Sequence, residues 1–352
     1  MRYIILPVLF LVVAGASCGG GGGSAPRTSK RVGALPEPPP FVPGTEMVVN
    51  GRRVNVEWPV VLWSDRVLLR DGKPPFNAYS TTCRDREGDY PADVATRPSK
   101  SPDDLLRYGS REPTRLAKAA AAKVRSGGWT DATLRDQVIQ FVMHYDVLGS
   151  STRCFRGLHD NRGLSVHFMV DLDGTIYQTM DVRDRAFHAG DNNDVSVGVE
   201  IASIGAVSTP KLLQAWYEPD GVGVRHQFPS HIDFGKLQRR DAIPRPARVA
   251  LQRGTIHGRE WYQYDFTQEQ YEALFHLGGA LCREFPKIRA RCPRGPDGRV
   301  LATSLPEKDR RTFEGLVGHW HVSPAKYDPG PAFDWDIVLE GIRTYLQRRP
   351  VR

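Results

Sequence analysis

Residues 318–335, near the C-terminus, bring together side chains that suit a hydrolytic metal site better than a hydrophobic core. The segment contains His319, Lys326 and Asp328 and then a Pro-Gly-Pro turn at 329–331. Imidazole and carboxylate groups bind Zn²⁺, and two imidazoles with one carboxylate leave a fourth tetrahedral position open, as in catalytic zinc sites. Because proline fixes φ and glycine tolerates positive φ, the turn can direct Asp328 back toward a metal.

This segment supplies only part of such a site, and His144 is the candidate for the second imidazole. Residues 138–143 are apolar and rich in β-branched types, which predicts a buried strand that ends at His144. A ligand at the end of a strand is held rigidly. Taken singly, His144 and His319 are more typical of core histidines and Asp328 of a turn residue. Only their combination indicates a metal site.

Glu200 is the candidate for a catalytic base. It interrupts the β-branched run at 195–201, which otherwise reads as a strand. Burying a carboxylate in such a run is costly unless the group is paired or used, and a general base beside a metal-activated water would be such a use. The alternative is a glutamate on an edge strand that faces solvent, and the pattern fits both readings.

Five segments, in this order, resemble the zinc-dependent N-acetylmuramoyl-L-alanine amidases, whose fold is shared by peptidoglycan recognition proteins. Several ordered matches are far more specific than any single one. The resemblance covers residues 135–205 and 265–346. Its segments are the strand ending in His144, the hairpin at 165–178 with its Asp-Gly turn, His188-Ala189-Gly190, residues 193–200 and residues 318–335.

The resemblance implies an α/β fold, in which a mixed central β-sheet is flanked by α-helices and carries a zinc site at its strand ends. It assigns three residues to Zn²⁺: His144, His319 and Asp328. Glu200 would be the general base, and Lys326 would stabilise the oxyanion. Two further residues would line or support the substrate cleft: His188 and Asn193. His321 competes with His319 as a ligand, and the family pattern together with Gly318 favours His319.

The implied reaction is hydrolysis of the amide between N-acetylmuramic acid and L-alanine, in peptidoglycan or in muropeptides, during cell-wall turnover. The alternative is a non-catalytic peptidoglycan-binding module on the same fold. Such modules typically lack a metal ligand, so the complete ligand set favours the enzyme. A formal charge of +8 and a pI near 9.3 fit a substrate that carries carboxylates. Nucleic acid is excluded as a partner because the Lys and Arg residues are dispersed and form no base-reading motif.

The N-terminus predicts export. Residues 1–17 combine Arg2, an apolar run at 4–13 and small residues, which is typical of a signal peptide and too short to span a bilayer. Cys18 then opens a Gly- and Pro-rich linker that extends to residue 45. We expect a bacterial lipoprotein in the periplasm that is anchored to the outer membrane only through acylated Cys18. Ordinary cleavage before Ser17 is the alternative.

Four cysteines remain if Cys18 carries a lipid, and an oxidising compartment would allow them to pair. They are Cys83, Cys154, Cys282 and Cys292. Three connectivities are possible, of which the local pair Cys282–Cys292 is the simplest, and it leaves Cys83 with Cys154.

The remaining organisation is an N-terminal β-rich extension at 46–130 and a catalytic domain at 131–350 with a long insertion at about 206–264. In the extension, Asn50-Gly51 predicts a hairpin, residues 59–69 a strand and residues 114–125 a helix. A capping box at Thr267 predicts the start of one helix, and a last helix is expected at 335–347. The aromatic-rich insertion reads equally well as a lid or binding loop and as an accessory subdomain with its own small core.

Overall fold

The computed structural model describes residues 42–65, 76–79, 107–229 and 242–348. The chain divides into two units, residues 1–40 and 41–352, and every described residue belongs to the second. The predicted signal peptide, Cys18 with most of its linker, and Cys83 lie outside the described residues. Among the helices of the described ranges, none is long and apolar enough to cross a membrane.

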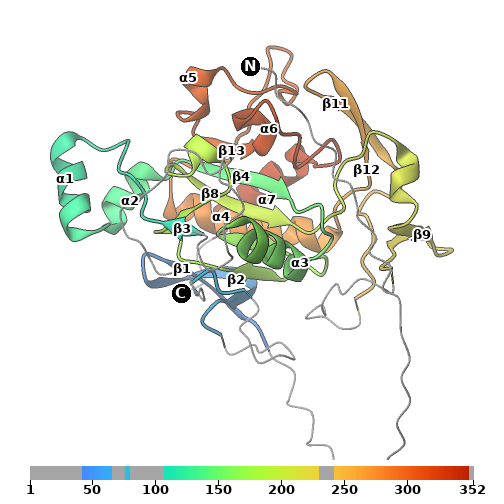
Figure 1. Ribbon diagram of the computed structural model, residues 1–352, viewed down its shortest axis with the longest axis horizontal. Coiled ribbons are helices and arrows are strands. Elements are labelled where there is room, and N and C mark those ends of the chain that lie inside the picture. Colours follow the sequence, from blue (N-terminus) through green and yellow to red (C-terminus); the bar gives the residue numbers. More distant parts are fainter. Residues whose placement is uncertain (1–41, 66–75, 80–106, 230–241, 349–352) are drawn as a thin grey trace, which may run out of the picture. The chain divides into compact units, whose positions relative to one another are not determined.

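A seven-stranded mixed sheet is the centre of the second unit, with the strand order β1-β2-β6-β5-β8-β4-β13 (Figure 1). Its strands are β1 (Gly44–Val49), β2 (Arg52–Leu62), β4 (Gln140–Tyr145), β5 (Phe168–Val170), β6 (Ile176–Gln178), β8 (Ser196–Ile201) and β13 (Gly315–Gly318). The β1–β2 and β5–β6 pairs are antiparallel, and the other neighbours are parallel. The predicted mixed α/β architecture is confirmed.

Two long helices cover one face of this sheet. The first, α4 (Gln268–Glu284), begins at the predicted capping box, in which the Thr267 and Gln270 side chains bond each other's backbone N–H. It packs against α7 (Trp335–Gln347), which has the predicted bounds. The shorter helices are α1 (Lys118–Gly127), α2 (Asp131–Gln137), α3 (Ser151–Phe155), α5 (Glu307–Arg310) and α6 (His319–Val322), with a π-helix at Arg156–Arg162 and 3-10 turns at Gly190–Asn192 and Pro210–Leu213.

The two faces of β8 have different roles. Alternate residues of β8 belong to the main hydrophobic core that also contains α4 and α7: Val197, Val199 and Ile201. The intervening residues point to the opposite face, because side chains alternate along a strand: Ser196, Gly198 and Glu200. Since β4 is paired in register with β8, His144 also points to that face. The strand pattern therefore places His144 and Glu200 together, away from the main core.

The predicted hairpin at Asn50-Gly51 is formed, and both turn residues have positive φ, as a two-residue hairpin turn requires. Its second strand, β2, is one continuous strand, although residues 59–69 were predicted to start a separate one. β2 also pairs in parallel with β6. The N-terminal extension thus contributes two strands to the central sheet itself. The predicted helix at 114–125 starts later, at Lys118, because residues 114–116 form turns.

The predicted disulfide Cys282–Cys292 is wrong. Cys154, Cys282 and Cys292 are all free, buried thiols. The Cys282 and Cys292 side chains pack into the main hydrophobic core, where burial raises their pKa to about 12 and about 11. They behave as small apolar core residues, which is a common role of buried free cysteine.

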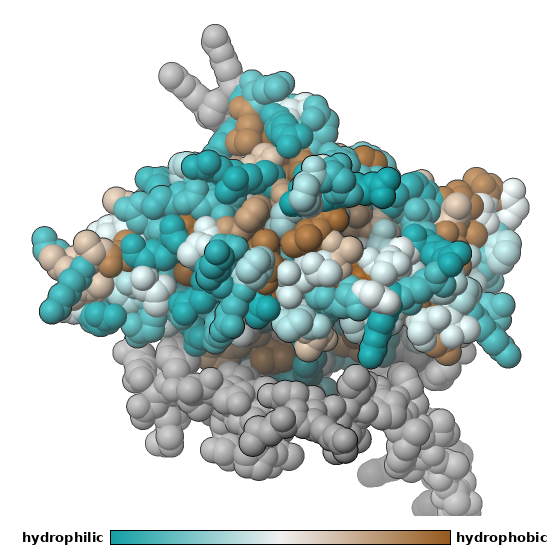
Figure 2. Space-filling view, turned by 90° about the horizontal axis from the view of Figure 1, so that it is seen from above, coloured by the Kyte–Doolittle hydropathy of each residue, from teal (hydrophilic) through white to brown (hydrophobic). Residues whose placement is uncertain are grey.

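The insertion forms hairpins. They are β9 (Tyr217–Pro219) with β10 (Val224–His226), and β11 (Gln252–Ile256) with β12 (Arg259–Gln263). A further small pair joins β3 (Tyr108–Gly109) to β7 (Arg185–Ala186). Figure 2 shows a mainly hydrophilic surface with scattered hydrophobic residues. Several of the exposed large hydrophobic side chains belong to the insertion: Leu212, Val222, Phe228, Ile243 and Val249.

Candidate metal centre

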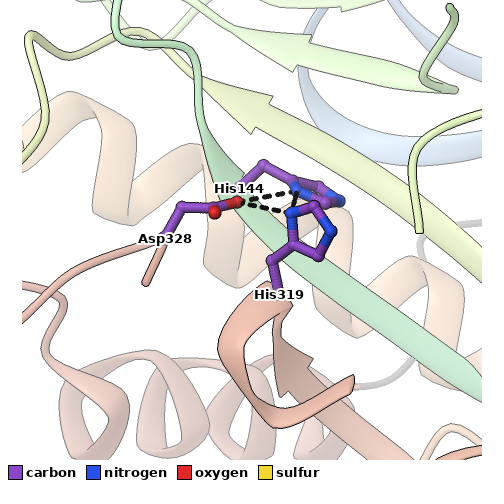
Figure 3. Close-up of side chains that lie close together, drawn as sticks. All are labelled: His144, His319 and Asp328. Carbon is purple, nitrogen blue, oxygen red and sulfur yellow. Dashed lines mark hydrogen bonds and ion pairs between the residues drawn. The ribbon is translucent and has the colours of Figure 1, made fainter. Parts of the chain in front are cut away.

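The three predicted ligands converge on one point (Figure 3). His144 Nδ1 lies 3.0 Å from His319 Nδ1, and both nitrogens lie 2.9 Å from Asp328 Oδ2. The three atoms thus form a nearly equilateral triangle. Among the described residues this is the one group of three His, Cys, Asp or Glu side chains close enough to share a metal ion.

Strand pairing delivers two of these ligands. β13 pairs in parallel with β4, and Gly318 lies opposite Met143. His319 follows directly as the first residue of α6, so it emerges beside His144. Gly318 is needed because a Cβ at this position would lie 2.9 Å from Pro329 Cδ, in the loop that carries Asp328.

The loop after α6 returns Asp328 to the same point. The backbone N–H of Trp320 donates to the Asp328 carbonyl at 3.3 Å, which ties the loop to α6. The turn that follows uses Gly330 at a φ of 84°, a left-handed conformation that glycine adopts without strain. The Pro-Gly-Pro turn therefore has the backbone geometry that its predicted role requires.

The donor set fits a zinc ion. A tetrahedral zinc with bonds of about 2.0–2.2 Å keeps its ligand atoms roughly 3.3 Å apart, so the triangle would need to open by only a few tenths of an ångström. Burial and the neighbouring His319 lower the pKa of His144 to about 4. Burial alone would raise the pKa of Asp328, but the two imidazoles, His319 first, hold it well below its usual value. A neutral imidazole and an ionised carboxylate are the states that bind metal.

His321 is not available as a ligand. Its ring is fully buried, Nδ1 accepts a hydrogen bond from the Gly318 N–H at 2.8 Å, and Nε2 donates to the Leu301 carbonyl at 2.8 Å. Both ring nitrogens are thus occupied by the backbone. Of the two histidines, His319 is therefore the one whose ring lies in the candidate metal site.

Glu200 lies beside the triangle, and one oxygen of its carboxylate has no hydrogen-bond partner among the described residues. It is paired in register with His144, and β8 lies between β5 and β4, so the alternative of an exposed edge-strand glutamate is excluded. Glu200 Oε2 is buried and has no hydrogen-bond partner among the described residues. Burial first, and then the charges of Asp328 and Asp146, raise the pKa of Glu200 well above its usual value. Such perturbed, unpaired groups concentrate at functional sites.

Lys326 is half-buried two residues before Asp328. Its positive charge lowers the pKa of both Glu200 and His144. For Glu200 this opposes the effect of burial, and for His144 it adds to the effect of burial. The ammonium therefore lies within electrostatic range of the predicted base and of a predicted ligand. A positive charge in this place suits a developing oxyanion.

His188 and Asn193 support the site from behind. His188 Nδ1 lies 3.0 Å from His144 Nε2, so His188 contacts a predicted ligand directly. The Asn193 side chain is buried, and its Oδ1 accepts from the backbone N–H groups of His188 and Ala189 at 3.1 and 2.7 Å. Asn193 thus fixes the turn that carries His188, and its predicted role at the substrate cleft stays a prediction.

The insertion braces the loop that carries Asp328, and the sequence did not reveal this. Gln263, fully buried at the end of β12, donates to the Pro329 carbonyl at 3.1 Å and accepts from the Ala332 N–H at 3.1 Å. Trp261 stacks on Tyr327, with ring centroids 4.0 Å apart and planes inclined by 13°. One hairpin thus contacts both sides of Asp328. The only sequence signal was the aromatic content of the insertion, which does not say what the aromatic rings contact.

The sequence of the chain matches the model of a known protein family. The family model described as N-acetylmuramoyl-L-alanine amidase matches residues 134–331, more than half of the chain. The chain belongs to this amidase family. The matched range of the chain includes every predicted site residue except Cys18, and it also includes the insertion with Trp261 and Gln263.

Among curated proteins no match was found. Solved structures similar to this chain include a selenomethionine derivative of AmpD, at 18% identity and a TM-score of 0.29, covering 60% of this chain and 87% of the other. Another is the N-acetylmuramyl-L-alanine amidase AmiD from E. coli in complex with anhydro-N-acetylmuramic acid-L-Ala-D-gamma-Glu-L-Lys, at 17% identity and a TM-score of 0.34, covering 58% and 57%. A third is Drosophila peptidoglycan recognition protein SD, at 12% identity and a TM-score of 0.26, covering 68% and 86%.

Proposed function

We propose that the chain is a zinc-dependent N-acetylmuramoyl-L-alanine amidase that hydrolyses the amide between N-acetylmuramic acid and L-alanine, in peptidoglycan or in muropeptides. One observation carries this proposal: the His144–His319–Asp328 triangle lies beside Glu200, whose buried carboxylate oxygen has no partner among the described residues. A ligand set with an adjacent unpaired base is the arrangement that amide hydrolysis requires.

Each residue of the site has a distinct task in this reaction. Zn²⁺, when bound by the triangle, supplies a Lewis acid and lowers the pKa of a bound water to about 7. Glu200 accepts a proton from the attacking water and later delivers it to the nitrogen of the leaving L-alanine. The products are the carboxyl group of the muramic lactyl substituent and the free amine of the stem peptide. Lys326 places positive charge where the tetrahedral oxyanion develops.

Hydrolysis of purified sacculi tests the proposal. The wild-type protein should release free stem peptides, and a chelator should abolish the release until Zn²⁺ is restored. Asp328→Ala should lose both bound metal and activity, and it serves as the matched inactive control. Release of disaccharides without peptide cleavage, or release that resists the chelator, would overturn the proposal. Binding to sacculi, with no cleavage either of sacculi or of a defined muropeptide, would identify the chain as a recognition module instead.

We also propose that the chain is a lipoprotein of the bacterial cell envelope, in the periplasm and anchored to the outer membrane through Cys18. The support is the signal-like composition of residues 1–17 and the cysteine that opens a glycine-rich tether. The wild-type protein should incorporate radiolabelled palmitate and sediment with outer membranes, whereas Cys18→Ala should do neither. An unlabelled wild-type protein in the soluble fraction would contradict the anchor.

A further inference from the structure

A chain of hydrogen bonds extends from the back of His144 into the protein. His144 Nε2 lies 3.0 Å from His188 Nδ1, and His188 Nε2 lies 3.3 Å from Ser196 Oγ. Ser196 Oγ in turn donates to the Asn192 carbonyl at 2.7 Å. Ser196 is fully buried, so no bulk water competes for its hydroxyl. Two imidazoles and one hydroxyl thus connect a predicted metal ligand to the backbone.

The direction of these hydrogen bonds follows from their far end. A carbonyl oxygen can only accept, so the one hydroxyl proton of Ser196 belongs to the bond with Asn192. Ser196 Oγ must then accept from His188, which places a proton on His188 Nε2. A neutral imidazole carries one ring proton, so His188 Nδ1 is an acceptor and His144 Nε2 is its donor. His144 Nδ1 is left with a lone pair, and this is the atom that faces His319 and Asp328.

The strand β8 is shaped to hold this chain of bonds. Its site-facing residues are Ser196, Gly198 and Glu200, two positions apart. A Cβ on Gly198 would lie 2.5 Å from His188 Nδ1 and 2.6 Å from His188 Cε1, so only glycine leaves room for the His188 ring. Asn193 Oδ1 accepts from the backbone N–H of His188 and fixes that part of the backbone. The ring of His188 is therefore packed closely against β8, and its backbone is held by Asn193.

We propose that His188 and Ser196 are positioning residues that set the tautomer of His144, so that His144 presents its Nδ1 lone pair to the metal. This inference rests on the proposed zinc site. A ligating histidine usually donates its other ring N–H to a carboxylate, a backbone carbonyl or water, and loss of such a partner typically lowers metal affinity 10- to 100-fold. Here a second imidazole takes that place, and Ser196 fixes its proton. His188 thereby acts through His144, behind the metal site.

Zinc affinity of the full chain, measured by competition with a chromophoric chelator, tests the inference without relying on activity. His188→Leu removes the acceptor for His144 and should weaken zinc binding about 10- to 100-fold. His188→Asn restores an acceptor oxygen close to the position of Nδ1 and should recover most of this loss. Ser196→Ala should weaken binding only a few-fold, because it removes the constraint on His188 but leaves the ring. His226→Leu removes another buried imidazole, in the insertion, and should bind zinc as the wild type does.

The possible failures are distinguishable. A wild-type chain that binds no Zn²⁺ would overturn the proposed zinc amidase, whereas wild-type affinity in His188→Leu would overturn only the role of His188. Equal losses of zinc affinity in His188→Leu and His188→Asn would also overturn the role of His188. An equal loss in His226→Leu would do the same. If His188→Leu does not fold, nitrogen NMR of the zinc-loaded wild type with labelled histidines decides the question. His188 should carry its proton on Nε2, and a proton on Nδ1 would contradict the inference.

Discussion

His144 and Glu200 are paired in register on the adjacent parallel strands β4 and β8. Both side chains therefore leave the sheet on the same face, and the distance between a predicted ligand and the predicted base is set by strand pairing rather than by a loop. Backbone hydrogen bonds on both sides hold β8, because it lies between β4 and β5. Sites on such rigid elements keep their geometry better than sites on loops.

Glu200→Gln should separate catalysis from metal binding. Glutamine has the same shape but cannot accept the proton of the attacking water, so we expect kcat to fall by about 10²- to 10⁴-fold with unchanged zinc content. Product release from a defined muropeptide and metal analysis of the same sample measure the two effects. Glu260→Gln, on the exposed part of the β11–β12 hairpin, should leave both unchanged. A Glu200→Gln variant that had also lost its zinc would argue against the role of Glu200 as a base.

His319→Ala should lose zinc binding, whereas His321→Ala should retain it. His319 faces the triangle, so its removal should abolish tight zinc binding and activity. His321 instead bonds the backbone with both ring nitrogens, so its removal should leave zinc bound. The His321 variant should lose about 1–3 kcal/mol of unfolding free energy for the buried groups that it leaves unpaired. Zinc titration measures the binding of the metal, and urea unfolding measures the loss of stability. If His321→Ala is folded but binds no zinc, the ligand role would belong to His321 instead of His319.

The features that the sequence predicted carry local signals. Asn50-Gly51 favours a two-residue hairpin turn wherever it stands between strands. The Thr267 capping box defines the start of α4 through neighbouring residues alone. Two residues of the candidate metal site could be predicted because each stands at the end of a recognisable element: His144 at the end of an apolar strand, and Asp328 before a Pro-Gly-Pro turn.

The features that the sequence did not predict depend on contacts between distant segments. Gln263 is one polar residue in a short strand, and only its contact with the turn 66 residues later gives it a role. Cys282 and Cys292 are close in the sequence, yet both are packed in the core as free thiols. Pairing of β2 with β6 joins segments far apart in the sequence, so no local pattern could show that the N-terminal hairpin completes the central sheet.

Lys326→Met should impair catalysis and spare the metal. Methionine keeps much of the length and apolar character of the side chain but removes its positive charge. If Lys326 stabilises the oxyanion, kcat should fall by about 10²- to 10³-fold, the range found when one stabilising group is removed from such a site. Zinc affinity should not fall, because the lysine is not a ligand and its charge opposes that of the cation. Lys326→Arg should retain part of the activity, and equal activity in wild type and Lys326→Met would exclude the proposed role.

Gln263→Leu tests whether the insertion braces the metal-binding loop. Leucine has a similar volume but leaves the Pro329 carbonyl and the Ala332 N–H without their partner. We expect a loss of about 1–3 kcal/mol in the free energy of unfolding, together with weaker zinc binding because Asp328 directly precedes this turn. Gln252→Leu, on the paired strand β11, is the matched control, since its side chain bonds only the exposed Ala250 carbonyl. If the wild type and Gln263→Leu bind zinc equally well, the hydrogen bonds of Gln263 contribute only to the stability of the fold.

Asp171→Asn should stabilise the protein increasingly as the pH rises. Asp171 is buried at the end of β5, and burial, followed by the charge of Asp173, raises its pKa from 3.8 to about 8. Between these two values the folded state holds a proton that the unfolded state has released, so the free energy of unfolding falls as the pH rises from about 4 to about 8 and then levels off.

Asparagine has no proton to lose, so the difference between the Asp171→Asn variant and the wild type should widen from pH 5 to pH 8. One unit of pKa shift corresponds to about 1.4 kcal/mol, which limits the widening to a few kcal/mol. Urea unfolding of both proteins at pH 5, 6, 7 and 8, with a chelator present to remove the effect of zinc, measures it. Because the titrations of groups distant from Asp171 cancel in the difference, a constant difference across this range would show that Asp171 is already ionised in the folded protein.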